Sequence, residues 1–301
     1  VITDLHGNIS PYFRVITRER AEAERLVSEG RLQFMITIPA DFDALVAAGK
    51  PPRIETRIFN INTDMTKNIR LRLDRALVEF AMARGTAPLR VVQTTTREQD
   101  VWRRSFIAAG ALAVALLVGA SLNTAIMAAR EWDRQTVKEV RLAPHAVWAT
   151  GLGKVLAGLV ATAANVTVTL VVAVTLFGLQ APVDRWLSAA GFGALVAIAG
   201  AGLGLGLGAW LRDYRTLQPL LLVTAAGSFF ASGRYGNVAT RPPAVRAFDA
   251  YWPPAFVFET LHALLHMPIL PDLSAVAWIL PLAVVSGLAF GLGLWRRSLS
   301  A

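Results

Sequence analysis

The feature that most constrains this chain is a stretch from Ser105 to Ala129 that contains no charged side chain. As an α-helix it would be about 37 Å long at a rise of 1.5 Å per residue, enough to cross the hydrocarbon core of a bilayer. Similar stretches follow at 152–178, 186–211, 216–232 and 275–295. The sequence therefore predicts an α-helical integral membrane protein with five transmembrane helices in this chain.

The composition supports this prediction, because 54% of the residues are hydrophobic, only 17% are charged, and the mean hydropathy is +0.47. More than half of the charged residues lie within residues 1–104. In that region short apolar runs alternate with amphipathic stretches, so we expect an N-terminal α/β domain at 1–104 and a transmembrane domain at 105–301. The expected helices are 19–29, 40–48 and 64–84, and the expected strand-like runs are 1–4, 12–16, 32–38 and 54–61.

Basic residues predict the orientation of the spans in the membrane. The larger set lies on one side: Arg130, Arg134, Lys138, Arg141, Lys154, Arg212, Arg215, Arg296 and Arg297. The smaller set lies on the other: Arg185, Arg234, Arg241 and Arg246. By the positive-inside rule the first set is cytoplasmic, so the N-terminal domain is extracytoplasmic. The chain opens on Val1 with no signal peptide, and we therefore expect a membrane segment before it.

Other features of the composition exclude several kinds of site. Cysteine is absent, which excludes disulfides and thiolate metal sites. The net charge of +9 is explained by basic cytoplasmic loops, so we expect no nucleic-acid partner.

Tryptophans fall at the ends of the expected spans, as interfacial anchors do. They are Trp102, Trp132, Trp148, Trp186, Trp210 and Trp295.

No phosphate-binding loop is visible in the sequence. Such a loop needs a Gly five residues before a Gly-Lys pair and a Ser or Thr after it. Lys50 is followed by Pro51 and Lys154 by Val155, so neither Gly-Lys pair fits. We expect that the chain is not an enzyme and binds no cofactor itself. An intramembrane enzyme is a distant alternative, because no span carries an Asp, Glu or His away from its ends.

Three helical patterns suggest packing or binding roles. Gly200, Gly204 and Gly208 share one face of a span, where another helix could approach closely. Thr162, Asn165 and Thr169 continue a stripe from Gly158 and either form interhelical hydrogen bonds or line a substrate path. Glu259, His262 and His266 share another face, which fits an amphipathic interfacial helix better than a metal site.

The loop after the first span reads as one charged amphipathic helix, from Arg130 to Pro144. Its mixed acidic and basic residues favour docking to a protein partner over lying on anionic lipid. The pattern resembles the permease subunit of ABC-2 type transporters, in which a span is followed by E-R-E-x-G-T-L-E-x-L-x-x-x-P and a later G-K. The matching positions here are Arg130-Glu131, Thr136, Leu142, Pro144 and Gly153-Lys154. This chain departs from the pattern at Gln135, where the family has Gly, and at Lys138, where it has an acidic residue; Glu139 follows.

The N-terminal region is similar to the large extracytoplasmic domain of the drug and lipid exporter branch of that family. The similar segments are Val1–Asp4, Tyr12–Val15, Ala21–Gly30, Ile38–Phe42 and Asn60–Asp64. The end of the fourth span at Ser232-Gly233, the Pro253-Pro254 segment and the basic C-terminus are also similar. Because the family has six transmembrane helices, the resemblance implies that this chain lacks the first one.

The resemblance implies a permease in a bacterial inner membrane that moves a hydrophobic or amphipathic drug or lipid outward. Its implied partners are a separate ABC ATPase, which uses ATP and Mg²⁺, and a second copy of the chain or a paralogous permease. The implied ATPase-coupling residues are Arg130, Glu131, Arg134, Thr136, Glu139, Pro144 and Lys154. The alternative function is a membrane anchor or sensor that transports nothing and whose outer domain binds a ligand.

Overall fold

The computed structural model describes residues 2–3, 9–10, 15–28, 32, 34–50, 53–58, 63–84, 90–95, 101–142, 144, 146–231, 244, 252–266 and 274–300. The chain divides into two compact units, the first comprising residues 1–103 and the second residues 104–266 and 272–301. The predicted outer-loop residues Arg234, Arg241 and Arg246 and the Ser232-Gly233 pair lie outside the described residues.

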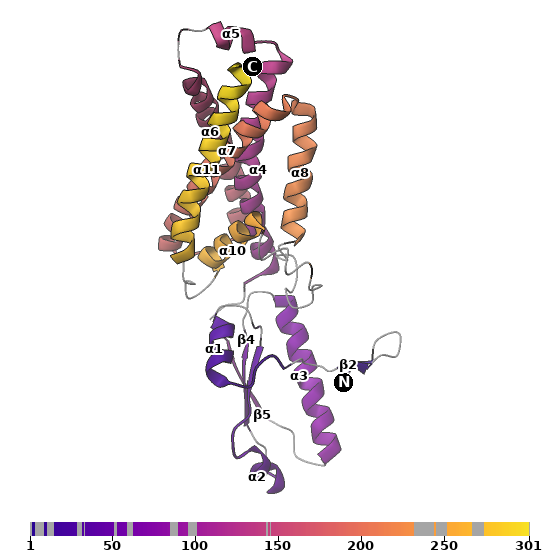
Figure 1. Cartoon of the computed structure of the whole chain (residues 1–301). Helices are drawn as coiled ribbons and strands as arrows, with labels where there is room; N and C mark the ends of the chain where they lie inside the picture. Colours follow the sequence, from indigo (N-terminus) through magenta and orange to yellow (C-terminus); the bar gives the residue numbers. More distant parts are fainter. Residues whose placement is uncertain are drawn as a thin grey trace. The chain divides into compact units, whose positions relative to one another are not determined.

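The first unit contains a three-stranded sheet with β4 (Arg53–Ile58) in its centre. β4 pairs antiparallel with β3 (Phe34–Thr37) and parallel with β5 (Arg90–Thr95), a strand that the sequence patterns did not predict. The long helix α3 (Thr63–Arg84) connects β4 to β5, as parallel strands require (Figure 1). The remaining described elements are α1 (Arg20–Ser28), α2 (Phe42–Ala47) and the β1 (Ile2–Thr3) and β2 (Ile9–Ser10) pair.

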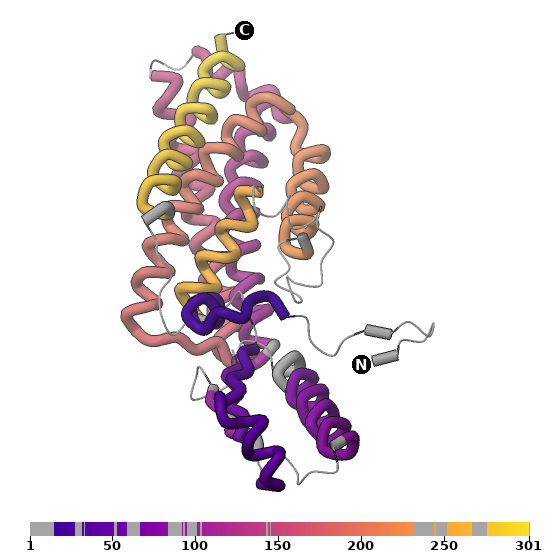
Figure 2. Tube along the Cα trace, turned by 60° about the horizontal axis from the view of Figure 1, so that its bottom comes forward, coloured from indigo at the N-terminus to yellow at the C-terminus, as the bar shows by residue number. Residues whose placement is uncertain are grey.

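The second unit is a helical bundle. Four of its described helices are long and apolar enough to cross a membrane: α4 (Arg103–Asp133), α6 (Val147–Thr175), α7 (Val183–Leu211) and α11 (Ser274–Ser300). The shorter α10 (Pro253–His266) packs against α7 and against α8 (Tyr214–Ala231) (Figure 2). α8 covers the predicted span 216–232 but is shorter and more polar than the four, since Arg215 and Gln218 lie in its first turns. A fifth crossing at α8 stays a prediction.

Glycines bring α7 close to helices on two of its faces. A methyl group at Gly204 or Gly208 would overlap the carbonyl oxygens of Ser121 and Ala125 in α4. On the face of α7 that packs against α11, Gly202 lies against the backbone of Gly287. A methyl group at Gly291 of α11 would overlap the Gly202 carbonyl oxygen. Because these contacts are made by backbone atoms, a larger side chain could not be accommodated by a change of rotamer.

Several hydroxyl groups of the membrane helices are satisfied within their own helices. Thr167, Thr169 and Thr175 each donate to the carbonyl four residues earlier, at 2.7–2.9 Å. Ser121 and Ser286 do the same in α4 and α11. This pattern suits a bilayer, which offers no water to pair an exposed hydroxyl.

Prediction: Gly204→Ala should lower the thermal unfolding midpoint of the purified protein in detergent, because the added methyl group forces α7 and α4 apart at a cost of about 1–3 kcal/mol. The matched control is Gly191→Ala in the same helix, since Gly191 has no atom within 4 Å of the added group. That substitution should leave the midpoint unchanged or raise it slightly through helix propensity. Equal midpoints for the two variants would contradict the role of close approach.

Candidate functional site

The candidate site is the turn between α4 and α6. The sequence predicted one helix from Arg130 to Pro144, and this is wrong. α4 continues to Asp133, the chain turns, and a separate short helix, α5 (Val137–Leu142), follows. The break is at Gln135, whose φ of 57° is left-handed and whose N–H donates to the Trp132 carbonyl at 3.2 Å. Glycine is favoured in this conformation, which gives a physical reason for the Gly of the family pattern at this position.

Glu131 is the centre of the hydrogen bonding in this turn. Its carboxylate forms an ion pair with the Lys154 ammonium in the second turn of α6 and accepts a hydrogen bond from the Thr136 hydroxyl. The Lys154 Nζ also donates to the Met127 carbonyl at 3.4 Å. Three of the predicted coupling residues therefore meet, and they connect the end of α4, the start of α5 and the start of α6.

This ion pair is mostly shielded from water. The Lys154 side chain is 15% exposed and the Glu131 side chain 21% exposed. Removal of one partner from such a pair is costly because the other charge stays in a poorly hydrated place. The pair therefore holds the turn against α6 in one geometry.

The other predicted coupling residues are more exposed than this pair. Arg134, Glu139 and Pro144 are exposed. Arg130 is also exposed, and its guanidinium lies 5.6 Å from the ring centroid of Tyr214 at the start of α8. The exposed groups, together with Lys138 and Leu142, form what we call the turn surface.

Sequence reasoning missed two contacts that join other helices to this turn. Arg141 in α5 donates to the Ser298 carbonyl in the last turn of α11, at 3.2 Å. Arg212, left-handed at the end of α7 with φ 56°, lies 5.3 Å from the ring centroid of Trp132. α5 and the C-terminal end of α11 lie at the same end of the bundle (Figure 1). Arg141 and Arg212 are evident in the sequence, but no local pattern predicts which residues they contact.

The α7–α8 connection at this end of the bundle is held by Asp213. The Thr216 hydroxyl donates to its carboxylate at 2.6 Å and the Arg215 N–H at 2.9 Å, which caps the start of α8. These hydrogen bonds, from the hydroxyl first, lower the pKa of the Asp213 carboxyl from its ordinary value.

The interfacial role predicted for the tryptophans fits only some of them. Trp102, Trp148 and Trp210 are exposed, as lipid-facing anchors should be. Trp295 is fully buried, so the prediction is wrong for it. Trp132 is half-buried and meets the Trp295 ring edge-on.

The polar stripe on α6 is divided between two environments. Thr162 is buried, donates to the Gly158 carbonyl at 2.7 Å, and accepts from the Asn123 amide of α4 at 3.2 Å. Asn165 is exposed and Thr169 half-buried on this chain. Thr162 therefore has the interhelical hydrogen bond that was one of the two readings of this stripe.

The pattern of Glu259, His262 and His266 on α10 is also divided between two environments. His262 and His266 are buried in α10, with their Nδ1 atoms 3.4 Å apart, and the His266 Nε2 lies 3.3 Å from the Ser105 hydroxyl. Glu259 is exposed on α10, so the three side chains do not converge. Within the described residues no group of three potential ligands is placed to hold a metal.

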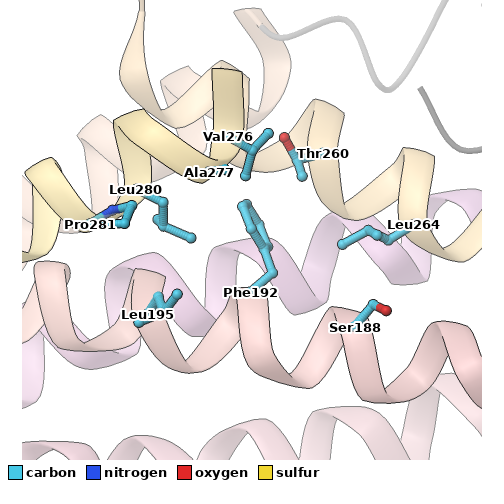
Figure 3. Close-up of a pocket in the computed structure, with 9 residues that line it drawn as sticks. All are labelled: Ser188, Phe192, Leu195, Thr260, Leu264, Val276, Ala277, Leu280 and Pro281. Atoms are coloured by element: carbon cyan, nitrogen blue, oxygen red, sulfur yellow. The ribbon is translucent and has the colours of Figure 1, made fainter. Parts of the chain in front are cut away.

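An apolar cavity of about 250 Å³ lies between α7, α10 and α11. Phe192 and Leu195 of α7 face Leu264 of α10 and Leu280 of α11 across it (Figure 3). Its other lining residues are Ser188, Thr260, Val276, Ala277 and Pro281. Pro281 has no N–H to donate to the Ala277 carbonyl, and Ser188 and Thr260 carry hydroxyls, so a few polar groups accompany a mainly apolar wall. Such a cavity can take an aliphatic chain or the apolar part of an amphipathic molecule.

In a comparison with known families, the family described as ABC-2 type transporter matches residues 78–265. The matched range runs from α3 through α10 and includes the whole candidate site. No curated protein matches the chain.

Prediction: Lys154→Met and Glu131→Gln should each lower the free energy of unfolding by about 2 kcal/mol, because each leaves one charge or amide without its partner in a poorly hydrated place. The double variant should cost clearly less than the two single variants together, because it leaves no unpaired charge. The exposed pair Arg75 and Glu79 in α3 is the control, and its removal should change stability by less than about 0.5 kcal/mol. Additive losses at the first pair would contradict the coupling of the two groups.

Proposed function

The chain belongs to the ABC-2 type transporter family, and on this premise we propose that it is the permease of an exporter driven by a separate ATPase that docks on the turn surface. Members of the family are membrane subunits of ABC transport systems, and the ATPase partner follows from membership. The observation that carries the proposal is the Glu131–Lys154 pair, which ties an exposed turn to the membrane helices.

The turn surface has the chemistry of a protein-docking site. Arg134, Lys138 and Glu139 present both signs of charge, and Leu142 is 85% exposed beside them. An exposed apolar side chain within a mixed polar rim is typical of a small protein interface. A site for anionic lipid would more often be purely basic.

Force applied to α5 has rigid paths into the bundle. α5 is joined to α6 through Thr136, Glu131 and Lys154, and to α11 through Arg141. α11 and α4 meet α7 at backbone contacts. A partner that binds two arrangements of the turn with different affinity would shift the bundle between two states, inward-open and outward-open.

The energy for this shift would come from the partner. Gly153 and Lys154 lie inside α6, and the Lys154 ammonium is engaged by Glu131. Lys154 is therefore occupied by a structural contact and not presented on a phosphate-binding loop.

The apolar cavity supports a hydrophobic or amphipathic drug or lipid as the transported substrate. α6 presents exposed apolar side chains, including Leu156, Val160 and Val168, which in a membrane face lipid or another chain. We propose that a second copy of the permease, or a paralogue, completes the transporter. In this proposal Asn165 and Thr169 are available to the substrate path, whereas Thr162 is occupied between α4 and α6.

Prediction: replacement of Arg134 and Glu139 with Ala, together with Leu142→Ser, should weaken binding of the ATPase about tenfold, a loss of about 1.4 kcal/mol, and lower substrate-stimulated ATP hydrolysis in parallel. The measurement is binding of the ATPase to the permease in lipid nanodiscs, followed by hydrolysis assays. Arg72→Ala on the exposed face of α3 is the control and should change neither. Unchanged ATPase binding in the triple variant would remove the turn surface from the mechanism and favour the anchor or sensor function.

Prediction: the orientation can be read by labelling, since the chain has no cysteine of its own. In spheroplasts a membrane-impermeant maleimide should label Arg72→Cys, because the N-terminal region is proposed to be extracytoplasmic. Lys138→Cys should be labelled only after the membrane is permeabilised. Labelling of Lys138→Cys in intact spheroplasts would overturn the proposal.

A further inference from the structure

We propose that Trp295 is a positioning residue of the coupling mechanism: it holds the Lys154 ammonium toward Glu131 and thereby ties α11 to the turn. This inference rests on the proposed function and extends it to a helix that carries none of the coupling residues predicted from the sequence. Trp295 is the largest fully buried side chain among the described residues, with no exposed surface.

The indole is fixed to the start of α6 by its N–H. The Nε1 lies 3.0 Å from the Thr150 hydroxyl and 3.2 Å from the Val147 carbonyl, both in the first turn of α6. α6 can come this close because residue 151 is glycine: an added methyl group there would lie 2.9 Å from the Trp295 ring. Hydrogen bonds on one edge leave the ring little freedom to rotate.

The face of the fixed ring then orients Lys154. The Lys154 Nζ lies 5.2 Å from the ring centroid, within the range of a cation–π contact. A lysine carries a flexible four-carbon stem, so a rigid wall on one side favours the rotamer that reaches Glu131. Trp132, which immediately follows Glu131, packs edge-on against the same ring at a centroid distance of 5.5 Å. One aromatic side chain thus contacts Lys154 directly and, through Trp132, the residue next to Glu131.

Arg141 adds an independent connection between the turn and α11. Its guanidinium donates to the Ser298 carbonyl, and a cation at a helix C-terminus is also favoured by the helix dipole. α11 is in backbone contact with α7 at Gly287 and Gly291, so it cannot slide freely along α7. A displacement of the turn would therefore reach the centre of the bundle through α11 as well as through α6.

The test compares Trp295→Phe and Trp295→Leu with the control Trp278→Leu, an exposed tryptophan of the same helix. The permease is reconstituted with its ATPase, and the ratio of substrate-stimulated to basal hydrolysis is measured. We expect Trp295→Leu to lower this ratio about fivefold, and Trp295→Phe to lower it less because it keeps an aromatic face. Binding of the ATPase should be unchanged in both, since Trp295 is not on the turn surface.

A double variant separates positioning from simple packing. If Trp295 acts through Lys154, then Trp295→Phe combined with Lys154→Met should lower the ratio no further than Lys154→Met alone. Losses that multiply, or a normal ratio in Trp295→Phe and Trp295→Leu, would overturn the inference and leave the proposed function intact. A wild-type complex without substrate stimulation would refute the proposed function and this inference with it. Trp295→Phe keeps the test possible if Trp295→Leu does not fold.

Discussion

The close approach of backbones at the glycines of α7 is the constraint on which the membrane unit depends. In a bilayer an apolar side chain gains little by leaving lipid, so helices associate through van der Waals contact and internal hydrogen bonds. Gly204 meets the backbone of α4 and Gly202 meets the backbone of α11. These contacts are short and involve no flexible side chain. α4, α7 and α11 are therefore expected to move as one body, while hydroxyls such as those of Thr167 and Thr175 are paired within their own helix.

The turn between α4 and α6 depends on the packed membrane helices for its position. α5 has six residues, too few to be stable as an isolated helix, so its position is set by the contacts at its two ends. Glu131 and Lys154 fix its beginning to α6, and Arg141 fixes its end to α11. The exposed residues of the turn, among them Arg134 and Leu142, therefore lie on a rigidly held segment. A docking surface on a stiff support can pass a displacement inward, which is what an external ATPase would need.

The sequence predicted most helices within a few residues, but it missed how the functional turn is built. The prediction of one helix from Arg130 to Pro144 failed because Gln135 has no strong turn preference, and its left-handed conformation is imposed by the contacts around it. Trp295 was predicted as a lipid-facing anchor because it ends a span. It is buried because Gly151 lets α6 approach α11 there. Thr162 belongs to a polar stripe whose role the sequence left open. In the structure its hydroxyl accepts a hydrogen bond from the Asn123 amide of another helix.

By itself, the sequence determined the four segments that are long and apolar enough to cross a membrane, and the charged motif that follows the first of them. These properties depend on composition and on spacing within one helix, where neighbours in space are neighbours in the chain. Only the tertiary structure decided that Lys154 meets Glu131, 23 residues away, and that the Trp295 N–H reaches Val147, 148 residues away. Such pairs form because helix packing brings distant segments together, and no local pattern in the chain specifies which of several basic or aromatic residues will meet.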